Sequence, residues 1–306
     1  MSSFIALGEI MVELAQTGEA SYRRGFAGDT FNTAWYARRL LPEDWSVSYG
    51  TCVGEDAVSD EMLAFIAAQR VDTTTIRRLQ DRTVGLYMIS LKDGERSFSY
   101  WRGQSAAKTL ADDLGWLDGI LKGREMIHFS AITLAILPPE KREYFCGALT
   151  RARQKGAIVA FDTNLRPRLW EGPEAMRKGL MLGARTADIV LPSFDEEEAL
   201  FGDTSPQQTL ARYREAGAEL VAVKQGGGDL VLWQRDSGDA VIPPVRVDTV
   251  VDTTAAGDSF AAGLLAGLAT GKPAGDAAQD AMALAAKVIQ STGALVPAIF
   301  ENGGEQ

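Results

Sequence analysis

One short turn carries the strongest chemical signal of the chain. Residues 252–260 read DTTAAGDSF and lie between a β-branched run and an apolar helix of small residues. The small residues Ala255, Ala256 and Gly257 bring backbone N–H groups to the start of that helix, where free donors and the helix dipole attract an anion. Asp258 lies in the same turn, and an acid beside a bound phosphate can accept the proton of an attacking hydroxyl. The turn predicts an anion site with a general base; the alternative is that Asp258 only caps the helix.

Polar side chains also follow two predicted strands. Asp162, Asn164 and Arg166 come directly after the run 157–161, and Lys224 follows the run 220–223. Ligands of doubly wound α/β folds bind at the carboxyl ends of the strands, so we expect these groups to line a site. Arginine forks suit carboxylate or phosphate oxygens, although a solvated surface loop is the alternative at 162–168. The turn after Lys224 could approach a nucleotide or be a plain tight hairpin, and it contains Gly226, Gly227, Gly228 and Asp229.

Two further polar segments precede helices. Flexible backbone at Gly28 is followed by Asp29, Thr30 and Asn32, where Asp29 or Thr30 could simply cap the next helix. The four acids at 195–198 open another helix, where the dipole stabilises carboxylates. They could instead organise water around magnesium, but capping is the favoured interpretation of that segment alone.

The hydrophobic pattern predicts the elements that position these groups. It alternates strand and helix and so predicts an α/β fold with a mixed, mostly parallel sheet sandwiched by helices. Strands are expected at 4–7, 47–53, 126–129, 157–161, 189–191, 220–223, 230–233 and 240–242, the last two antiparallel. Helices are expected at 31–40, 56–70, 139–154, 173–185, 195–201 and 206–217, with further helices near the end and a frayed tail at 301–306.

The alternation breaks between residues 73 and 104. Two β-rich runs, 85–91 and 97–101, flank Asp93-Gly94, which is a hairpin signal. A hairpin that cannot join the main sheet in order is a lid over a site or an ordinary peripheral hairpin. We expect a single domain over 1–306, with lid segments around 9–26 and 73–104.

Composition limits the class of protein. The 306 residues are 46% apolar and 24% charged, as in ordinary globular proteins, and the net charge of −10 argues against nucleic acid or an anionic membrane as the main partner. Cys52 and Cys146 form no metal-spaced pair and favour a cytoplasmic location. His128, inside an apolar run, is interpreted as a structural strand residue, so a zinc site or a histidine triad lacks parts. The chain has no Gly-x-x-x-x-Gly-Lys-Ser/Thr loop and no Gly-x-Gly-x-x-Gly after its first strand, and we expect neither export nor a membrane span.

Four motifs in order resemble the ribokinase-like (PfkB) sugar kinases over nearly the whole chain. They are AGDTFN (27–32), DTNLR (162–166), KQG (224–226) and DTTAAGD (252–258). Within the family the chain is most similar to members that phosphorylate 2-keto-3-deoxygluconate. The segments that carry this similarity are RGF (24–26), GLY (85–87), YWR (100–102), LAIL (134–137), RPRLW (166–170) and VDTTAAGDSF (251–260).

The resemblance implies ATP-dependent phosphorylation of the terminal hydroxyl of that sugar acid. Asp258 would be the base, and the N–H groups of Ala255, Ala256 and Gly257 would stabilise the migrating phosphoryl group. Arg102 and Arg166 could pair with the sugar carboxylate, as suits arginine forks. The remaining implied sugar contacts are Gly28, Asp29, Thr30, Asn32, Tyr87 and Tyr100.

The resemblance also implies a nucleotide site and Mg²⁺ carried with ATP. Asp195 would assist at that site, and Glu198 could order the magnesium through water. The implied nucleotide contacts are Asn164, Arg166, Lys224, Gly226, Gly227, Gly228, Asp229, Ala256, Gly257, Met282 and Ala285.

Three residues depart from the family pattern. Ala255 stands where most members have glycine, which predicts that this turn needs no positive φ. Asp195 replaces a frequent asparagine, and Asp229 replaces a common glycine. A fructokinase or another sugar kinase is the first alternative, and a sugar-binding sensor without catalysis is the second. Aromatic side chains of the lid make a homo-oligomer plausible.

Overall fold

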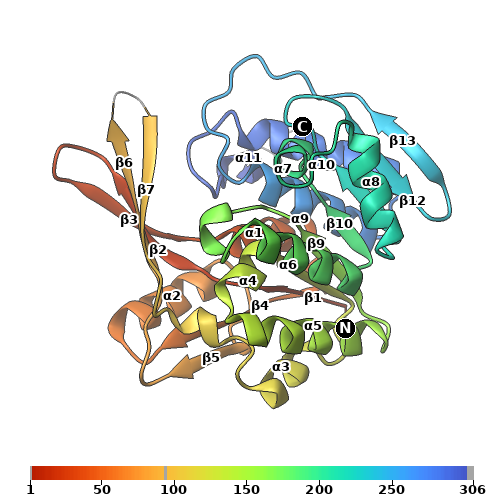
Figure 1. The fold of residues 1–306 in the computed structure, drawn as a ribbon. Coiled ribbons are helices and arrows are strands. Elements are labelled where there is room, and N and C mark those ends of the chain that lie inside the picture. The colour runs from red at the N-terminus through yellow and green to blue at the C-terminus, as the bar shows by residue number, and fades with distance from the viewer. Residues whose placement is uncertain (1, 93–94, 302–306) are drawn as a thin grey trace.

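A nine-stranded β-sheet forms the centre of the molecule in the computed structural model, which describes residues 2–92 and 95–301 (Figure 1). Its order is β13-β12-β11-β10-β9-β8-β1-β4-β5. All neighbours from β11 to β5 are parallel, and β12 and β13 are antiparallel additions, which confirms the predicted mixed sheet. The strands are β1 (Ser3–Leu7), β4 (Ser46–Gly54), β5 (Ile76–Leu79), β8 (Met126–Ser130), β9 (Ile158–Asp162), β10 (Ile189–Leu191), β11 (Leu220–Val223), β12 (Leu230–Gln234) and β13 (Gly238–Ile242).

Helices cover both faces of this sheet because successive strand residues point to opposite faces. In β1, Phe4 packs in one apolar cluster and Ile5 in the other. The first cluster includes α1 (Asp29–Leu40), α2 (Ala57–Ala68), α9 (Ala256–Ala269) and α10 (Ala274–Val288). The second includes α3 (Leu114–Leu121), α4 (Ala131–Ile136), α5 (Pro139–Arg153), α6 (Pro173–Thr186), α7 (Phe194–Phe201) and α8 (Pro206–Glu215). Short helical turns lie at Ala106–Thr109, Pro167–Leu169 and α11 (Ala298–Glu301).

A second sheet of four strands stands beside the main body, on the left of Figure 1. We call it the small sheet; its order is β3-β2-β6-β7, from β2 (Met11–Gln16), β3 (Tyr22–Ala27), β6 (Leu86–Lys92) and β7 (Glu95–Trp101). The predicted hairpin is confirmed, since β6 and β7 pair antiparallel. Its turn at 93–94 and most of the expected frayed tail lie outside the described residues. The segment 73–104 also contains β5, which pairs with β4 in the large sheet, so only its later part builds the small sheet.

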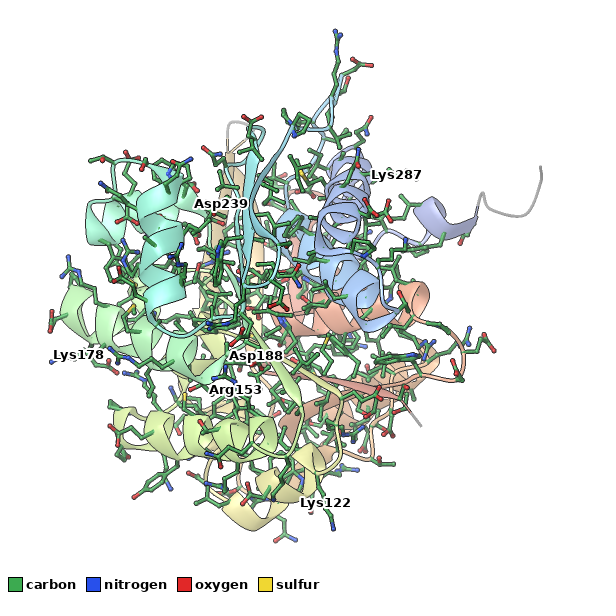
Figure 2. All side chains as sticks on the ribbon, turned by 90° about the vertical axis from the view of Figure 1, so that its right-hand side faces the viewer. Lys122, Arg153, Lys178, Asp188, Asp239 and Lys287 are labelled. Atoms are coloured by element: carbon green, nitrogen blue, oxygen red, sulfur yellow. The ribbon has the colours of Figure 1, made fainter. Side chains whose placement is uncertain are left out.

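An ion pair links the end of α5 to the residue that precedes β10. Figure 2 shows Arg153, at the end of α5, beside Asp188, and their Nε–Oδ1 distance is 2.6 Å. Asp188 also accepts the Val159 N–H at 2.9 Å, so both groups are occupied in holding α5 to the sheet. Of the helices in the described ranges, none has the length and apolar character to cross a membrane.

Candidate active site

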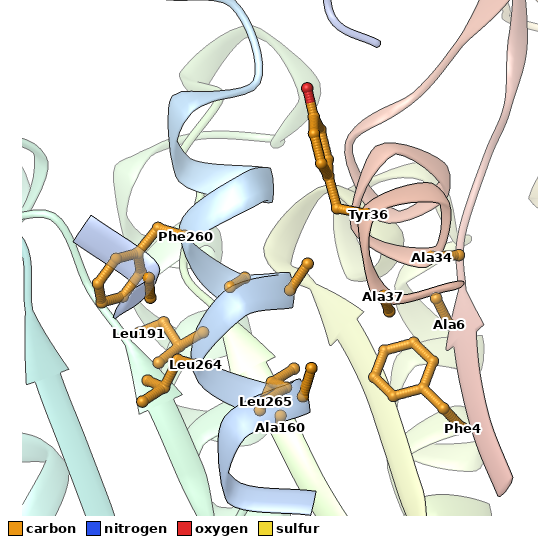
Figure 3. Packing of buried hydrophobic residues seen from close by; sticks show 14 of the residues in the cluster. Phe4, Ala6, Ala34, Tyr36, Ala37, Ala160, Leu191, Phe260, Leu264 and Leu265 are labelled. Atoms are coloured by element: carbon orange, nitrogen blue, oxygen red, sulfur yellow. The ribbon is translucent and has the colours of Figure 1, made fainter. Parts of the chain in front are cut away.

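Helix α9 brings Asp258 to the centre of the molecule. Figure 3 shows Phe260, Leu264 and Leu265 of α9 packed over the sheet, next to Tyr36 and Ala37 of α1. Small residues on α9 allow α10 to approach closely, since a Cβ built on Gly263 would lie 2.8 Å from the Ala281 Cα. The small residues of α9 therefore let it pack closely against α10.

The Asp258 side chain faces α1 and does not cap its own helix. Its Oδ2 accepts a hydrogen bond from Asn32 Nδ2 at 2.8 Å, and its backbone carbonyl accepts one from the Thr33 hydroxyl at 3.3 Å. The N-cap of α9 is Ala255, which makes no side-chain cap bond. The capping interpretation of Asp258 is thus wrong, and its carboxylate is held by a neutral amide.

The surroundings of the Asp258 carboxyl favour its protonated form. Desolvation raises the pKa of its carboxyl well above the ordinary range, and the charges of Asp29 and Asp162 raise it further. The Asn32 hydrogen bond and the Lys224 charge oppose the rise. A carboxylate with a raised pKa accepts a proton more readily, as a general base must.

The backbone before Asp258 forms a turn with free donors. Ala256 N–H donates to the Thr253 carbonyl at 3.2 Å, whereas the hydrogen bonds of the described residues include no acceptor for the N–H groups of Gly257 and Asp258. Ala255 adopts φ 61° and ψ 15°, the left-handed region. The prediction that this turn needs no positive φ is therefore wrong; the left-handed residue is what turns the chain into α9 and leaves the next N–H groups facing outward.

A cation lies beside these free N–H groups. Lys224 Nζ donates to Asp162 Oδ1 at 3.0 Å, and both side chains are largely buried. A Cβ built on Gly257 would lie 3.7 Å from Lys224 Nζ and 4.0 Å from Asp162 Oδ2, so the open face of Gly257 looks toward this pair. Two backbone bonds, between Lys224 and residues 192 and 194, fix the lysine at the end of β11.

The segment 28–32 lies against the loop after β9. Asp29 Oδ2 accepts hydrogen bonds from Ser130 Oγ at 2.5 Å and from Asn164 Nδ2 at 3.0 Å. Thr30 is fully buried, with its hydroxyl 3.0 Å from the Tyr49 hydroxyl. The structure thus joins two segments that lie more than a hundred residues apart in the sequence.

Side chains at the base of the small sheet face the same region. Tyr87 donates a hydrogen bond to Glu13, and its ring centre lies 5.9 Å from that of Tyr100. The proximity of Asp258 contributes to raising the pKa of the Tyr87 hydroxyl, after burial and Glu13. Arg102 forms a buried ion pair with Glu9.

Comparisons with known proteins agree with this arrangement. Residues 1–299 match the model of the pfkB family carbohydrate kinases. The chain belongs to the pfkB family of carbohydrate kinases. This makes it a sugar kinase that uses ATP, as the resemblance implies.

Individual members of the pfkB family resemble the chain over most of its length. It is 39% identical to the 2-dehydro-3-deoxygluconokinase of Escherichia coli strain K12 over 97% of this chain and 98% of that one. A crystal structure of a PfkB protein from Polaromonas sp. JS666 matches with a TM-score of 0.85 and 26% identity, over 99% and 100% of the two chains. An uncharacterized sugar kinase from Pyrococcus horikoshii, in complex with ATP, matches with a TM-score of 0.78 and 25% identity over 95% and 93%.

The two arginines expected at a sugar carboxylate are already paired in this pfkB protein. Arg102 contacts Glu9, and Arg166 Nη1 lies 3.3 Å from Glu196 Oε1. Arg102 is largely buried, whereas half of the Arg166 side chain is exposed. Each arginine keeps further donors, since a guanidinium has five N–H groups.

Glu196 is the acid of segment 195–198 that reaches the site. Its Oε2 accepts the Leu165 N–H at 3.1 Å, and burial raises its pKa against the opposing charges of Lys224 and Arg166. Asp195 and Glu198, the residues expected here, have exposed side chains on α7. The signal that could have found Glu196 is its place in the first turn after β10, beside the neighbouring loop.

Two groups of expected nucleotide contacts lie in the turn after Lys224 and on α10. Gly226 has φ 58°, and Gly228 N–H donates to the Gln225 carbonyl at 2.9 Å, so the turn after Lys224 is closed by its own backbone. Met282 and Ala285 are partly buried on α10. The described residues contain no group of three or more histidine, cysteine, aspartate or glutamate side chains that could hold a metal ion. The acids near Lys224 include Asp162, Glu196 and Asp258.

Proposed function

We propose that the chain transfers the γ-phosphoryl group of ATP to the terminal hydroxyl of 2-keto-3-deoxygluconate, giving 2-keto-3-deoxy-6-phosphogluconate and ADP. One observation carries the proposal. The buried carboxylate of Asp258, held by Asn32, lies in the helix turn whose Gly257 and Asp258 N–H groups are free. A base and an anion site in one turn are what phosphoryl transfer to a hydroxyl requires.

Each group then has a role in the transfer. Asp258 accepts the hydroxyl proton while the sugar oxygen forms a bond to the γ-phosphorus and the bond from that phosphorus to the β-bridging oxygen breaks. The free N–H groups and Lys224 stabilise the charge on the transferred group, and preorganised donors of this kind contribute a few kcal/mol. Mg²⁺ bound with the nucleotide would neutralise charge on the phosphate oxygens, and Asp162 and Glu196 are the residues that would order its water.

The identity of the sugar rests on relatives and on charge. The relative at 39% identity is named for this substrate. Arg102 and Arg166 retain donors for a carboxylate, and Tyr87 and Tyr100 present hydroxyls and apolar ring faces at the base of the small sheet. An ATP complex of a related sugar kinase supports the nucleotide.

The small sheet serves as the lid of this active site. Three aromatic side chains of β7, Phe98, Tyr100 and Trp101, are 43%, 49% and 58% exposed. A second copy of the chain, meeting the first lid to lid, would cover them. Two free, buried cysteines fit a reducing cytoplasm.

The test is a panel of sugar acids and neutral sugars assayed with ATP, using the natural protein and Asp258→Asn. We expect turnover of the keto-acid far above that of fructose or ribose, and loss of almost all turnover in the variant, because the amide cannot accept the proton. Turnover of neutral sugars alone would show that the keto-acid is not the substrate. An active Asp258→Asn would refute the base.

A further inference from the structure

The carboxylate of Asp29 lies where α1, β8 and the loop after β9 meet. It belongs to the first turn of α1, and one of its oxygens accepts from Ser130, at the end of β8, and from Asn164, after β9. Both bonds end on Oδ2, at 2.5 and 3.0 Å. Two other elements therefore fix this side chain, which is more than a sugar ligand at the rim of a site needs.

The same residue lies next to Asp258, since the Thr33 hydroxyl donates to the backbone carbonyls of both, at 3.2 Å to Asp29 and 3.3 Å to Asp258. Asp29 lies in the first turn of α1, where the positive end of the helix dipole favours an acidic side chain. Lys224, whose charge opposes the rise in the pKa of Asp258, donates to Asp162.

We propose that Asp29 is a positioning residue for the transfer and not a sugar ligand: it orients Asn164 and keeps a second negative charge beside the Asp258 carboxylate. This inference rests on the proposed role of Asp258 as the base. The fixed charge favours the protonated form of Asp258, so it strengthens the pull of the base on the hydroxyl proton.

The charged groups around Asp258 support the role of the Asp29 charge. After burial, Asp29 is the largest cause that raises the pKa of the Asp258 carboxyl. Asp162 acts in the same sense and Lys224 in the opposite one. The other titratable groups that face either acid are Tyr36 of α1, Tyr49 of β4, Tyr87 of β6 and His128 of β8.

The first test is Asp29→Asn, because an amide oxygen can accept both present hydrogen bonds while the charge is lost. The acidic limb of kcat/KM reports the ionisation of the base in the free enzyme. Without the charge of Asp29 the base ionises more easily, so this limb should move to lower pH by about 1 unit, as expected for a close like charge. kcat at neutral pH should fall several-fold, and KM for the sugar should stay nearly constant.

The matched control is Asp118→Asn, the same chemical change at an exposed residue of α3 whose partner is Arg151. It should leave the pH profile and both kinetic constants unchanged. An unmoved limb in Asp29→Asn would overturn the inference. A large rise in the KM for the sugar without a shift of the limb would instead assign Asp29 as a sugar ligand.

A second pair of variants keeps the test open if Asp29→Asn does not fold. Ser130→Ala removes one hydrogen bond and keeps the charge, whereas Ser130→Thr keeps the hydroxyl and also the cap that this residue forms for α4. We expect a lower kcat with an unchanged sugar KM in Ser130→Ala, and recovery in Ser130→Thr. Equal kcat in the natural protein and Ser130→Ala would refute the positioning role. If Asp258→Asn is inactive but the Asp29 and Ser130 variants behave like the natural protein, the role of Asp29 is refuted and the role of Asp258 as the base stands.

Discussion

Gly28 is the position at which one methyl group should do the most damage. Its φ of −178° and ψ of 146° are extended and suit any residue, so the cost of a substitution comes from contact alone. A Cβ at Gly28 would lie 2.1 Å from the Glu9 carbonyl oxygen and 3.1 Å from the Ile10 Cα. These are backbone atoms of the link between β1 and β2, so no side-chain rotation can relieve the clash.

The Gly28→Ala variant must therefore separate two backbone segments by about 1 Å. Forcing an extra carbon into a packed site costs about 1–3 kcal/mol. The melting temperature should fall by roughly 2–8 °C, taking a few degrees per kcal/mol for a chain of this size. The Gly28 carbonyl accepts the Asn32 N–H at 2.8 Å, so the displacement reaches the residue that holds Asp258. A displacement of about 1 Å in a catalytic constellation can lower kcat/KM about 100-fold.

Calorimetry and the coupled kinase assay measure the two effects separately. Gly275→Ala is the matched control, since a Cβ on this exposed glycine of α10 would meet nothing within 4 Å. It should leave kcat/KM unchanged and raise stability by up to about 1 kcal/mol, because alanine favours helix over glycine. If Gly28→Ala melted with the natural protein and kept its kcat/KM, the tight approach of Gly28 to Glu9 would be refuted.

Two further predictions concern stability. Burial lowers the pKa of His128 from 6.5 to about 4, so below pH 6.5 the unfolded chain binds a proton that the folded chain excludes. The free energy of unfolding, measured with urea, should therefore fall by about 2 kcal/mol from pH 7 to pH 5. The His128→Gln variant should lack this fall. Arg212→Met should cost about 3–5 kcal/mol in the same measurement because it leaves the buried carboxylates of Glu197 and Asp203 without their cation. Arg151→Met, which breaks an exposed pair, should cost less than about 1 kcal/mol, and equal costs for the two arginines would contradict this reasoning.

Periodicity predicted the elements because each face of the large sheet is buried by its own helices. The strands of the centre are short apolar runs, and the positions of 4–7 and 220–223 differ from β1 and β11 by one residue at most. Polar groups at the ends of these strands had to meet at one edge. Asp162 and Lys224 were therefore predictable as neighbours.

Contacts that depend on side-chain direction were beyond the sequence. Four acids at 195–198 have similar chemistry, and the phase of α7 alone decides that Glu196 faces Leu165 and that Glu197 is buried against Tyr213. The left-handed conformation of Ala255 runs against the preference of its residue type. Only the requirement of the turn, imposed by the packing of α9, explains it.

The buried pair of Glu9 and Arg102 limits how the small sheet can move against the large one. Glu9 follows β1 of the large sheet and Arg102 follows β7 of the small one. The ion pair therefore connects the two sheets at the base of the small sheet. A buried charge that loses its partner is destabilising by about 3–5 kcal/mol, so separation of the pair is disfavoured. If the small sheet moves as the proposed lid, its strands must bend beyond this ion pair, and Arg102 stays in place.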